Sequence, residues 1–173
     1  MQTIIVFINH AFYLLRMKLK DIMSKKVLAL KPEQTIEDAL HLFAKHNIHG
    51  APVVDDSGYI VGIFTESDFL SALRKKTTNP QMVFPSIPLM GISFVDSPLQ
   101  KEISDVVRET VKMPISKVMK KTVHTLPSSA DVKDAIRMMI THRITRIPIM
   151  DDKKLVGIVT RTDIIKMGLG TED

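Results

Sequence analysis

Apolar and polar residues follow one order that occurs twice along the chain. In the first copy, an apolar run at 27–30 precedes an amphipathic stretch at 36–43, and apolar runs follow at 51–54 and 60–64. In the second copy, the corresponding segments are 123–126, 132–140, 147–150 and 155–159. Apolar positions spaced by three and four residues predict a buried helical stripe, and short apolar runs between turn residues predict strands. With a closing helix after the last strand, each copy is predicted to fold as β-α-β-β-α.

The two copies are also similar residue by residue. Residues 23–56 align with 119–152 at an offset of 96, and residues 60–68 align with 155–163 at an offset of 95. Sixteen pairs are identical over this span, which indicates an internal repeat. One unit of about 50 residues buries too little apolar surface to be stable alone. We therefore predict an α+β fold in which tandem β-α-β-β-α repeats pack face to face as one domain.

These patterns divide the chain into an N-terminal apolar segment at 1–16, the first repeat at 17–73, a linker at 74–114 and the second repeat at 115–173. The first segment is shorter than the roughly 20 apolar residues that cross a bilayer, and it lacks the features of a signal peptide. We expect it to cover an apolar edge of the fold. In the linker, prolines and a glycine interrupt an apolar stretch at 81–95, whereas Ser97-Pro98 predicts the start of an amphipathic helix packed against the repeats.

The main candidate for ligand chemistry is a Thr-x-x-Asp motif after the last strand of each copy. Thr65 and Asp68 form it in the first copy, and Thr160 and Asp163 form it in the second. A strand that leads into a helix at this motif brings a hydroxyl, a carboxylate and the first N–H groups of the helix together. A small polar ligand fits such a place. The motif also satisfies the pattern of a helix capping box, and the two interpretations are compatible.

Composition narrows the function classes. The 173 residues are 45% hydrophobic and 25% charged and include no cysteine, which indicates a globular protein without disulfides, cysteine nucleophiles or thiolate metal sites. No residues have the spacing of a catalytic set or of a metal site. The net charge of +5 comes without an arginine-rich run, so nucleic acid is not favoured as a partner. We expect a cytoplasmic protein without membrane association.

Two further recurrences have simple structural explanations. His46 and His142 fall at equivalent helix ends, where an imidazole complements the helix dipole. The pairs Lys25-Lys26 and Lys120-Lys121 recur beside the first strand of each copy. They form either a solvated turn or a cation pair that attracts phosphate.

The ordered motifs resemble the cystathionine-β-synthase (CBS) domain. The first copy contains Asp21-Ile-Met23, Thr35-Ile-Glu-Asp-Ala39, Gly50-Ala-Pro-Val-Val-Asp55 and Gly62-Ile-Phe-Thr-Glu-Ser-Asp68. The second contains Lys117-Val-Met119, Arg146-Ile-Pro-Ile-Met-Asp151 and Gly157-Ile-Val-Thr-Arg-Thr-Asp163. Together they are similar to a Bateman module that covers 18–167 apart from the linker. This resemblance implies pseudo-twofold symmetry and two clefts, which in the family commonly hold AMP, ADP, ATP or S-adenosylmethionine.

The resemblance also implies roles for single residues. Asp68 and Asp163 would hold ribose hydroxyls, and Thr65 and Thr160 would contact the first phosphate. The residues that would hold adenine, through backbone and apolar side chains, are Leu28, Ala29 and Ala51 in the first copy and His124, Thr125 and Ile147 in the second.

Two arginines complete the predicted site. Arg146 matches a basic residue that the family often has, whereas the first copy has Gly50 there. Arg161 stands where the first copy has Glu66. A guanidinium attracts a phosphate and a carboxylate repels it, so the second copy is predicted to prefer the more phosphorylated ligand.

We therefore predict an adenine-nucleotide-binding regulatory or energy-sensing module that is not an enzyme, needs no obligatory cofactor and acts by ligand-linked conformational change. One alternative is an S-adenosylmethionine or adenosine sensor, and another is an oligomerising scaffold with vestigial clefts. We expect a homodimer through the helices of both repeats, with Leu42 and Met138 as equivalent exposed apolar positions. A regulated protein partner is expected, but its identity is unknown.

Overall fold

The computed structural model describes residues 17–76 and 98–169. The expectations for residues 1–16 and 81–95 lie outside the described residues. The chain forms two compact units. The first-copy unit comprises 29–55 and 61–122, and the second-copy unit comprises 1–28, 56–60 and 123–173, as far as these are described. Each unit therefore combines most of one repeat with the first residues of the other repeat, 17–28 or 115–122.

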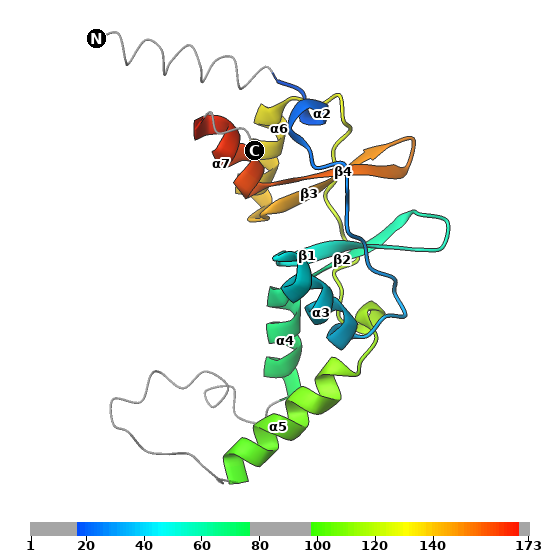
Figure 1. Cartoon of the computed structure of the whole chain (residues 1–173), viewed down its shortest axis with the longest axis vertical. Helices are drawn as coiled ribbons and strands as arrows, with labels where there is room; N and C mark the ends of the chain where they lie inside the picture. The colour runs from blue at the N-terminus through cyan, green and yellow to red at the C-terminus, as the bar shows by residue number, and fades with distance from the viewer. Residues whose placement is uncertain (1–16, 77–97, 170–173) are drawn as a thin grey trace, which may run out of the picture. The chain divides into compact units, whose positions relative to one another are not determined.

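The first-copy unit is built around a small sheet and its helices. Its elements in chain order are α3 (Ile36–His46), β1 (Gly50–Val54), β2 (Ile60–Thr65), α4 (Glu66–Lys76), α5 (Pro98–Val111) and the short 3-10 helix η2 (Ile115–Lys117) (Figure 1). β1 and β2 form a two-stranded sheet. Ile36, Ala39 and Phe43 are spaced by three and four residues, so they lie on one face of α3 and are buried in the core. There the Phe43 ring stacks on the Phe64 ring, with the centroids 6.0 Å apart.

The second-copy unit has the same plan. Its elements are α2 (Leu19–Ile22), α6 (Val132–His142), β3 (Arg146–Asp151), β4 (Lys154–Thr160) and α7 (Arg161–Leu169) (Figure 1). β3 and β4 pair antiparallel, with an irregularity between Ile149 and Met150. The buried core joins α6 and the two strands to Leu19 of α2, which belongs to the first repeat in sequence. Helices and small sheets in both units confirm the predicted α+β class.

The predicted strands at 27–30 and 123–126 are wrong as strands. Each is reduced to one parallel bridge, from Leu30 to Val53 and from Leu126 to Ile149. After Leu30 the next N–H on this side would be that of residue 32, which is a proline and has none. After Leu126 the next is that of Ser128, which donates to the Asp151 side chain instead.

Pro52 and Pro148 lie inside β1 and β3. Their carbonyls accept hydrogen bonds from the N–H groups of Leu30 and Leu126, at 2.9 and 3.4 Å. This side of each strand has only the single bridge, so the missing proline N–H breaks no ladder there. The edge of a sheet is where a strand tolerates proline.

Two equivalent segments each add one backbone bridge to a sheet. Ser24 forms an antiparallel bridge with Ile158 of β4, and Lys120 forms one with Ile63 of β2. Just before each bridge, a methionine packs against a glycine of the strand, Met23 on Gly157 and Met119 on Gly62. Neither glycine has room for a β-carbon.

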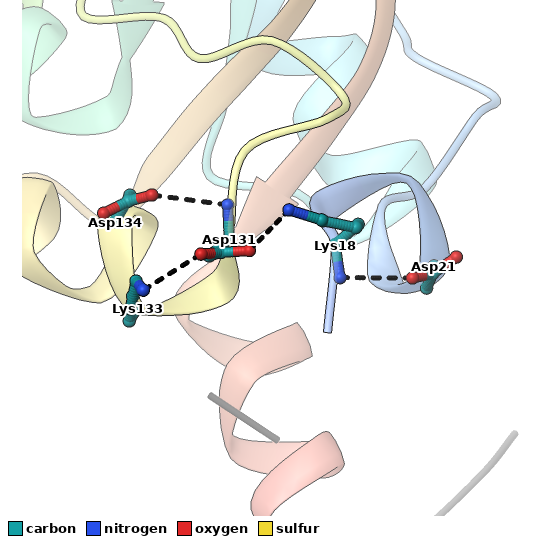
Figure 2. Close-up of polar contacts among 5 residues, drawn as sticks. All are labelled: Lys18, Asp21, Asp131, Lys133 and Asp134. Carbon is teal, nitrogen blue, oxygen red and sulfur yellow. Dashed lines mark hydrogen bonds and ion pairs between the residues drawn. The ribbon is translucent and has the colours of Figure 1, made fainter. Parts of the chain in front are cut away.

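Within the second-copy unit, an ionic cluster joins the residue before α2 to the start of α6 (Figure 2). The Lys18 ammonium lies 2.8 Å from Asp131 Oδ1, and the Lys133 ammonium lies 3.0 Å from Asp131 Oδ2. The N–H of Asp131 donates to Asp134 Oδ2 at 3.3 Å. Asp131 is the residue just before the start of α6. At the equivalent place in the first-copy unit, Thr35 and Pro114 share only a backbone bridge.

The linker helix predicted from Ser97-Pro98 is confirmed as α5, which contacts α3 and α4. Thr110 is fully buried, and its hydroxyl donates to the carbonyl of Val106 at 2.7 Å. Val111 packs against the first-copy core. The last turn of α5 therefore contributes to the stability of this unit.

Candidate functional site

The Thr-x-x-Asp motif forms the same corner in both units. β2 ends at Thr65 and α4 begins at the next residue. Asp68 Oδ2 accepts hydrogen bonds from the N–H and the hydroxyl of Thr65, at 2.9 and 2.6 Å. In the second-copy unit, Asp163 Oδ2 accepts from the N–H and hydroxyl of Thr160, at 2.6 and 2.7 Å. Each aspartate thus caps the chain at the helix start with one carboxylate oxygen.

The second carboxylate oxygen distinguishes the two corners. Asp68 is buried, with 6% of its side chain exposed, and its Oδ1 lies 3.3 Å from the Lys120 ammonium. Asp163 is only partly buried, and no lysine or arginine in the described part of the chain forms an ion pair with it. The aspartate of the first corner therefore has an ion pair at its second oxygen, and among the described residues the aspartate of the second corner has none.

The residues after the two threonines have different surroundings. The backbone N–H of Glu66 donates to the carbonyl of His49, and that of Arg161 to the carbonyl of Thr145, at 3.2 and 2.9 Å. These bonds tie each helix start to the residue just before β1 or β3. The Glu66 carboxylate also lies 3.1 Å from His49 Nδ1, in an exposed pair.

The Arg161 side chain lines an open hollow of about 430 Å³ in the second-copy unit. The other lining residues come from α6, the turn after it and α7: Ile136, Met139, Ile140, Arg143, Ile144 and Ile164. Most of the lining is aliphatic. The hollow lies on the helical side of the unit, where Ile140 is 74% exposed.

The predicted adenine-contacting residues fall into two groups. Ala51 and Ile147 belong to the buried cores of their units, so any contact with a ligand would come from their backbone. Ala29 is exposed, and Leu28 and Thr125 are partly buried. Leu28 and Ala29 belong to different units although they are adjacent in sequence.

His124 has a partner that sequence reasoning missed. Its ring stacks on that of His142, with the centroids 3.7 Å apart and the planes inclined at 22°. His142 is the last residue of α6, as predicted for a helix end. The two residues lie eighteen positions apart without a shared motif, so only the fold brings them together.

The predicted site residues therefore gather by unit. Arg146 begins β3 and is partly buried, and it shares the second-copy unit with His124, Thr125, Ile147, Thr160, Arg161 and Asp163. Thr65 and Asp68 share the first-copy unit with Ala29 and Ala51. Lys120, from the first residues of the second repeat, is an additional residue at the corner of Thr65 and Asp68. The repeated Lys120-Lys121 pair was the only sequence signal for it.

No group of three or more histidine, aspartate or glutamate side chains is arranged to hold a metal ion among residues 17–76 and 98–169. Within the same residues, no helix has the length and apolar character needed to cross a membrane.

Comparison with known proteins identifies the family. The family model of the CBS domain matches residues 19–75 and 115–170. Uncharacterized protein MJ1426 of Methanocaldococcus jannaschii is 32% identical over 156 residues, which cover 87% of this chain and 90% of that protein. The chain belongs to the CBS domain family and has the fold of a CBS domain pair.

Two solved structures with bound ligands are similar to this chain. CBSX2 in complex with AMP has a TM-score of 0.64 and 25% identity, and the match covers 90% of this chain and 99% of that one. The CBS domain pair of MJ0100, in complex with 5′-methylthioadenosine and S-adenosyl-L-methionine, has a TM-score of 0.61 and 26% identity, with coverages of 87% and 98%. CBSX2 of Arabidopsis thaliana is described as chloroplastic, and the matched region spans 58% of its full length.

Proposed function

We propose that this chain is a regulatory module that binds an adenosine-containing ligand and transmits its binding to a protein partner. The observation that carries the proposal is the duplicated corner, in which each Thr-x-x-Asp motif presents a hydroxyl and a carboxylate at a helix start. Each aspartate uses one oxygen for the cap. The other oxygen contacts the Lys120 ammonium in Asp68 and keeps an acceptor position for a ligand hydroxyl in both motifs. The ligands of CBSX2 and MJ0100 share an adenosine group with a vicinal diol.

Within this proposal, AMP, ADP and ATP are the first candidates and S-adenosylmethionine is the alternative. Asp68 and Asp163 would accept the ribose hydroxyls, because an ionised carboxylate has about four acceptor positions and the cap uses only some of them. Ligand binding would favour one arrangement of the chain over another, and a partner would respond to that difference. A role without catalysis and a cytoplasmic location remain predictions.

Thermal unfolding of the whole chain tests the proposal. A ligand at 100 times its dissociation constant contributes about 2.7 kcal/mol, which should raise the melting temperature by roughly 5–10 °C in a chain of this size. We expect this shift with at least one of AMP, ADP, ATP, S-adenosylmethionine or 5′-methylthioadenosine. Asp68→Ala and Asp163→Ala should each reduce it, and Asp152→Ala, at an exposed turn residue, should not. Absence of any shift with all five compounds would contradict the proposal.

A further inference from the structure

Lys120 is held at the corner of Thr65 and Asp68 by its backbone. The N–H of Ile63 donates to the carbonyl of Lys120 at 2.9 Å, and the N–H of Lys120 donates to the carbonyl of Ile63 at 3.0 Å. Ile63 lies two residues before Thr65 on β2, on the same face of the strand. The position of Lys120 beside the corner is therefore a property of the fold and not only of a flexible side chain.

The second-copy unit contains a natural comparison. Ser24 is the residue equivalent to Lys120, and it makes the same two backbone hydrogen bonds with Ile158, both of 3.0 Å. Ile158 lies two residues before Thr160 on β4. The same backbone arrangement thus presents an ammonium group at one corner and a short neutral hydroxyl at the other.

The Lys120 ammonium can serve a ligand without leaving Asp68. It lies 3.3 Å from Asp68 Oδ1, whereas Thr65 bonds only to Oδ2. A carboxylate oxygen accepts about two hydrogen bonds and an ammonium has three donors. Oδ1 can therefore accept a ligand hydroxyl beside Lys120, and the ammonium keeps donors for a second group. Its side chain is 66% exposed, so those donors are accessible.

The charge of Lys120 discriminates between classes of adenosine ligand. A phosphate is attracted by an ammonium, an uncharged adenosine is not, and the sulfonium of S-adenosylmethionine is repelled. Glu66 is the nearby charge that would oppose a phosphate, and its carboxylate lies 3.1 Å from Nδ1 of His49 in an exposed contact. A comparison of Glu66 with Arg161 alone leaves out the Lys120 ammonium at the first corner.

We propose that Lys120 makes the corner of Thr65 and Asp68 selective for phosphorylated adenosine ligands, and that Ser24 supplies no such cation to the corner of Thr160 and Asp163. This proposal assigns the preference to the first copy, whereas Arg161 and Arg146 alone predict it for the second. The inference rests on the proposed function, because it assigns a ligand class to each of the two corners. It identifies Lys120 as a specificity-determining residue in a segment outside the Thr-x-x-Asp motif.

Calorimetry with AMP and adenosine on the full chain tests the inference. Asp163→Ala isolates the first corner, and in that background AMP should bind more tightly than adenosine. Adding Lys120→Ser should lower the affinity for AMP by roughly fivefold, the upper range for an exposed ion pair. The affinity for adenosine should stay nearly unchanged. Lys120→Arg keeps the charge and should keep the preference for AMP. The ratio of the two affinities is measured on one folded protein, so a general loss of stability does not imitate the effect.

The reciprocal variant tests the other corner. In an Asp68→Ala background, Ser24→Lys should raise the affinity for AMP and lower that for S-adenosylmethionine. Unchanged ratios of AMP to adenosine in both Lys120→Ser and Ser24→Lys would overturn the inference and leave the proposed function intact. A wild-type chain that binds none of these compounds would overturn both.

Discussion

At the scale of single residues, three aspartates have pKa values below their ordinary range because donors stabilise the ionised carboxylate. The backbone N–H and then the hydroxyl of Thr35 lower the pKa of Asp38. Hydrogen bonds from Lys18 and then Lys133 lower the pKa of Asp131, and Ser128 lowers that of Asp151. A carboxyl whose pKa is lower in the folded state contributes stability above its unfolded pKa and loses it as the pH falls through the folded value.

Asp131 gives the clearest pH prediction because two lysines from different segments contact it (Figure 2). Asp131→Asn should lower the urea midpoint at pH 7. The stabilising contribution of ionised Asp131 is complete above its unfolded pKa of about 4. It is lost as the pH falls from there through the lower pKa of the folded state. The difference between wild type and variant should therefore shrink from pH 5 to pH 2.5. Asp152→Asn, at an exposed turn position, is the matched control and should show no such trend. An equal difference at both ends of the pH range would exclude the ionic explanation.

At the scale of elements, both sheets depend on a segment that belongs to the other repeat in sequence. Met119 covers Gly62 of β2, and Met23 covers Gly157 of β4. The contacts differ in what surrounds the glycine. A β-carbon on Gly62 would meet the Lys120 carbonyl at 3.0 Å as well as Met119, whereas on Gly157 its three nearest atoms all belong to Met23.

Alanine substitution should therefore separate the two glycines. Gly62→Ala and Gly157→Ala should each destabilise the chain by about 1–3 kcal/mol through overpacking. Adding Met23→Ala should recover much of the loss from Gly157→Ala, because the obstructing atoms are a flexible side chain. Adding Met119→Ala should recover less from Gly62→Ala, because a backbone carbonyl remains. Double-mutant cycles by urea unfolding measure the two couplings.

Gly168 provides a control of opposite sign for this experiment. It lies in α7, where an added β-carbon would have no neighbouring atom within 4 Å, so Gly168→Ala should stabilise the chain by about 0.5–1 kcal/mol through helix propensity. Equal recovery in the two cycles would show that the carbonyl of Lys120 does not matter.

Most of the local structure follows from the sequence, and the pairing of segments does not. Periodicity located α3 and α6, and the capping pattern of Thr35 and Asp38 predicted the start of α3. The Thr-x-x-Asp corners were predicted with both of their interpretations, and the structure shows the cap. The contact of Lys120 with Asp68 was not predictable, because no local pattern shows that the first residues of one repeat pack on a strand of the other.

At the scale of the whole molecule, the expected dimer surface requires a correction. Leu42 and Met138 were predicted to be exposed, but both are partly buried and pack against the cores of their own units. The apolar residues that are exposed at equivalent helix positions are Leu70 on α4 and Ile165 on α7, at 42% and 53%. An apolar position repeated in both copies is typical of an isologous contact between two identical chains.

We predict a homodimer in which Leu70 and Ile165 contribute to the contact. The wild-type chain should have twice its mass of 19.5 kDa in light scattering, and Leu70→Asp with Ile165→Asp should reduce this to one chain, because a dimer contact would have to bury both carboxylates. Lys75→Asp, at an exposed position of the same helix α4, should leave the dimer intact. Leu42→Asp and Met138→Asp should instead lower the melting temperature, since these side chains pack against the cores. A folded double variant that keeps the dimer mass would place the contact elsewhere, and a monomeric wild type at micromolar concentration would rule out the homodimer.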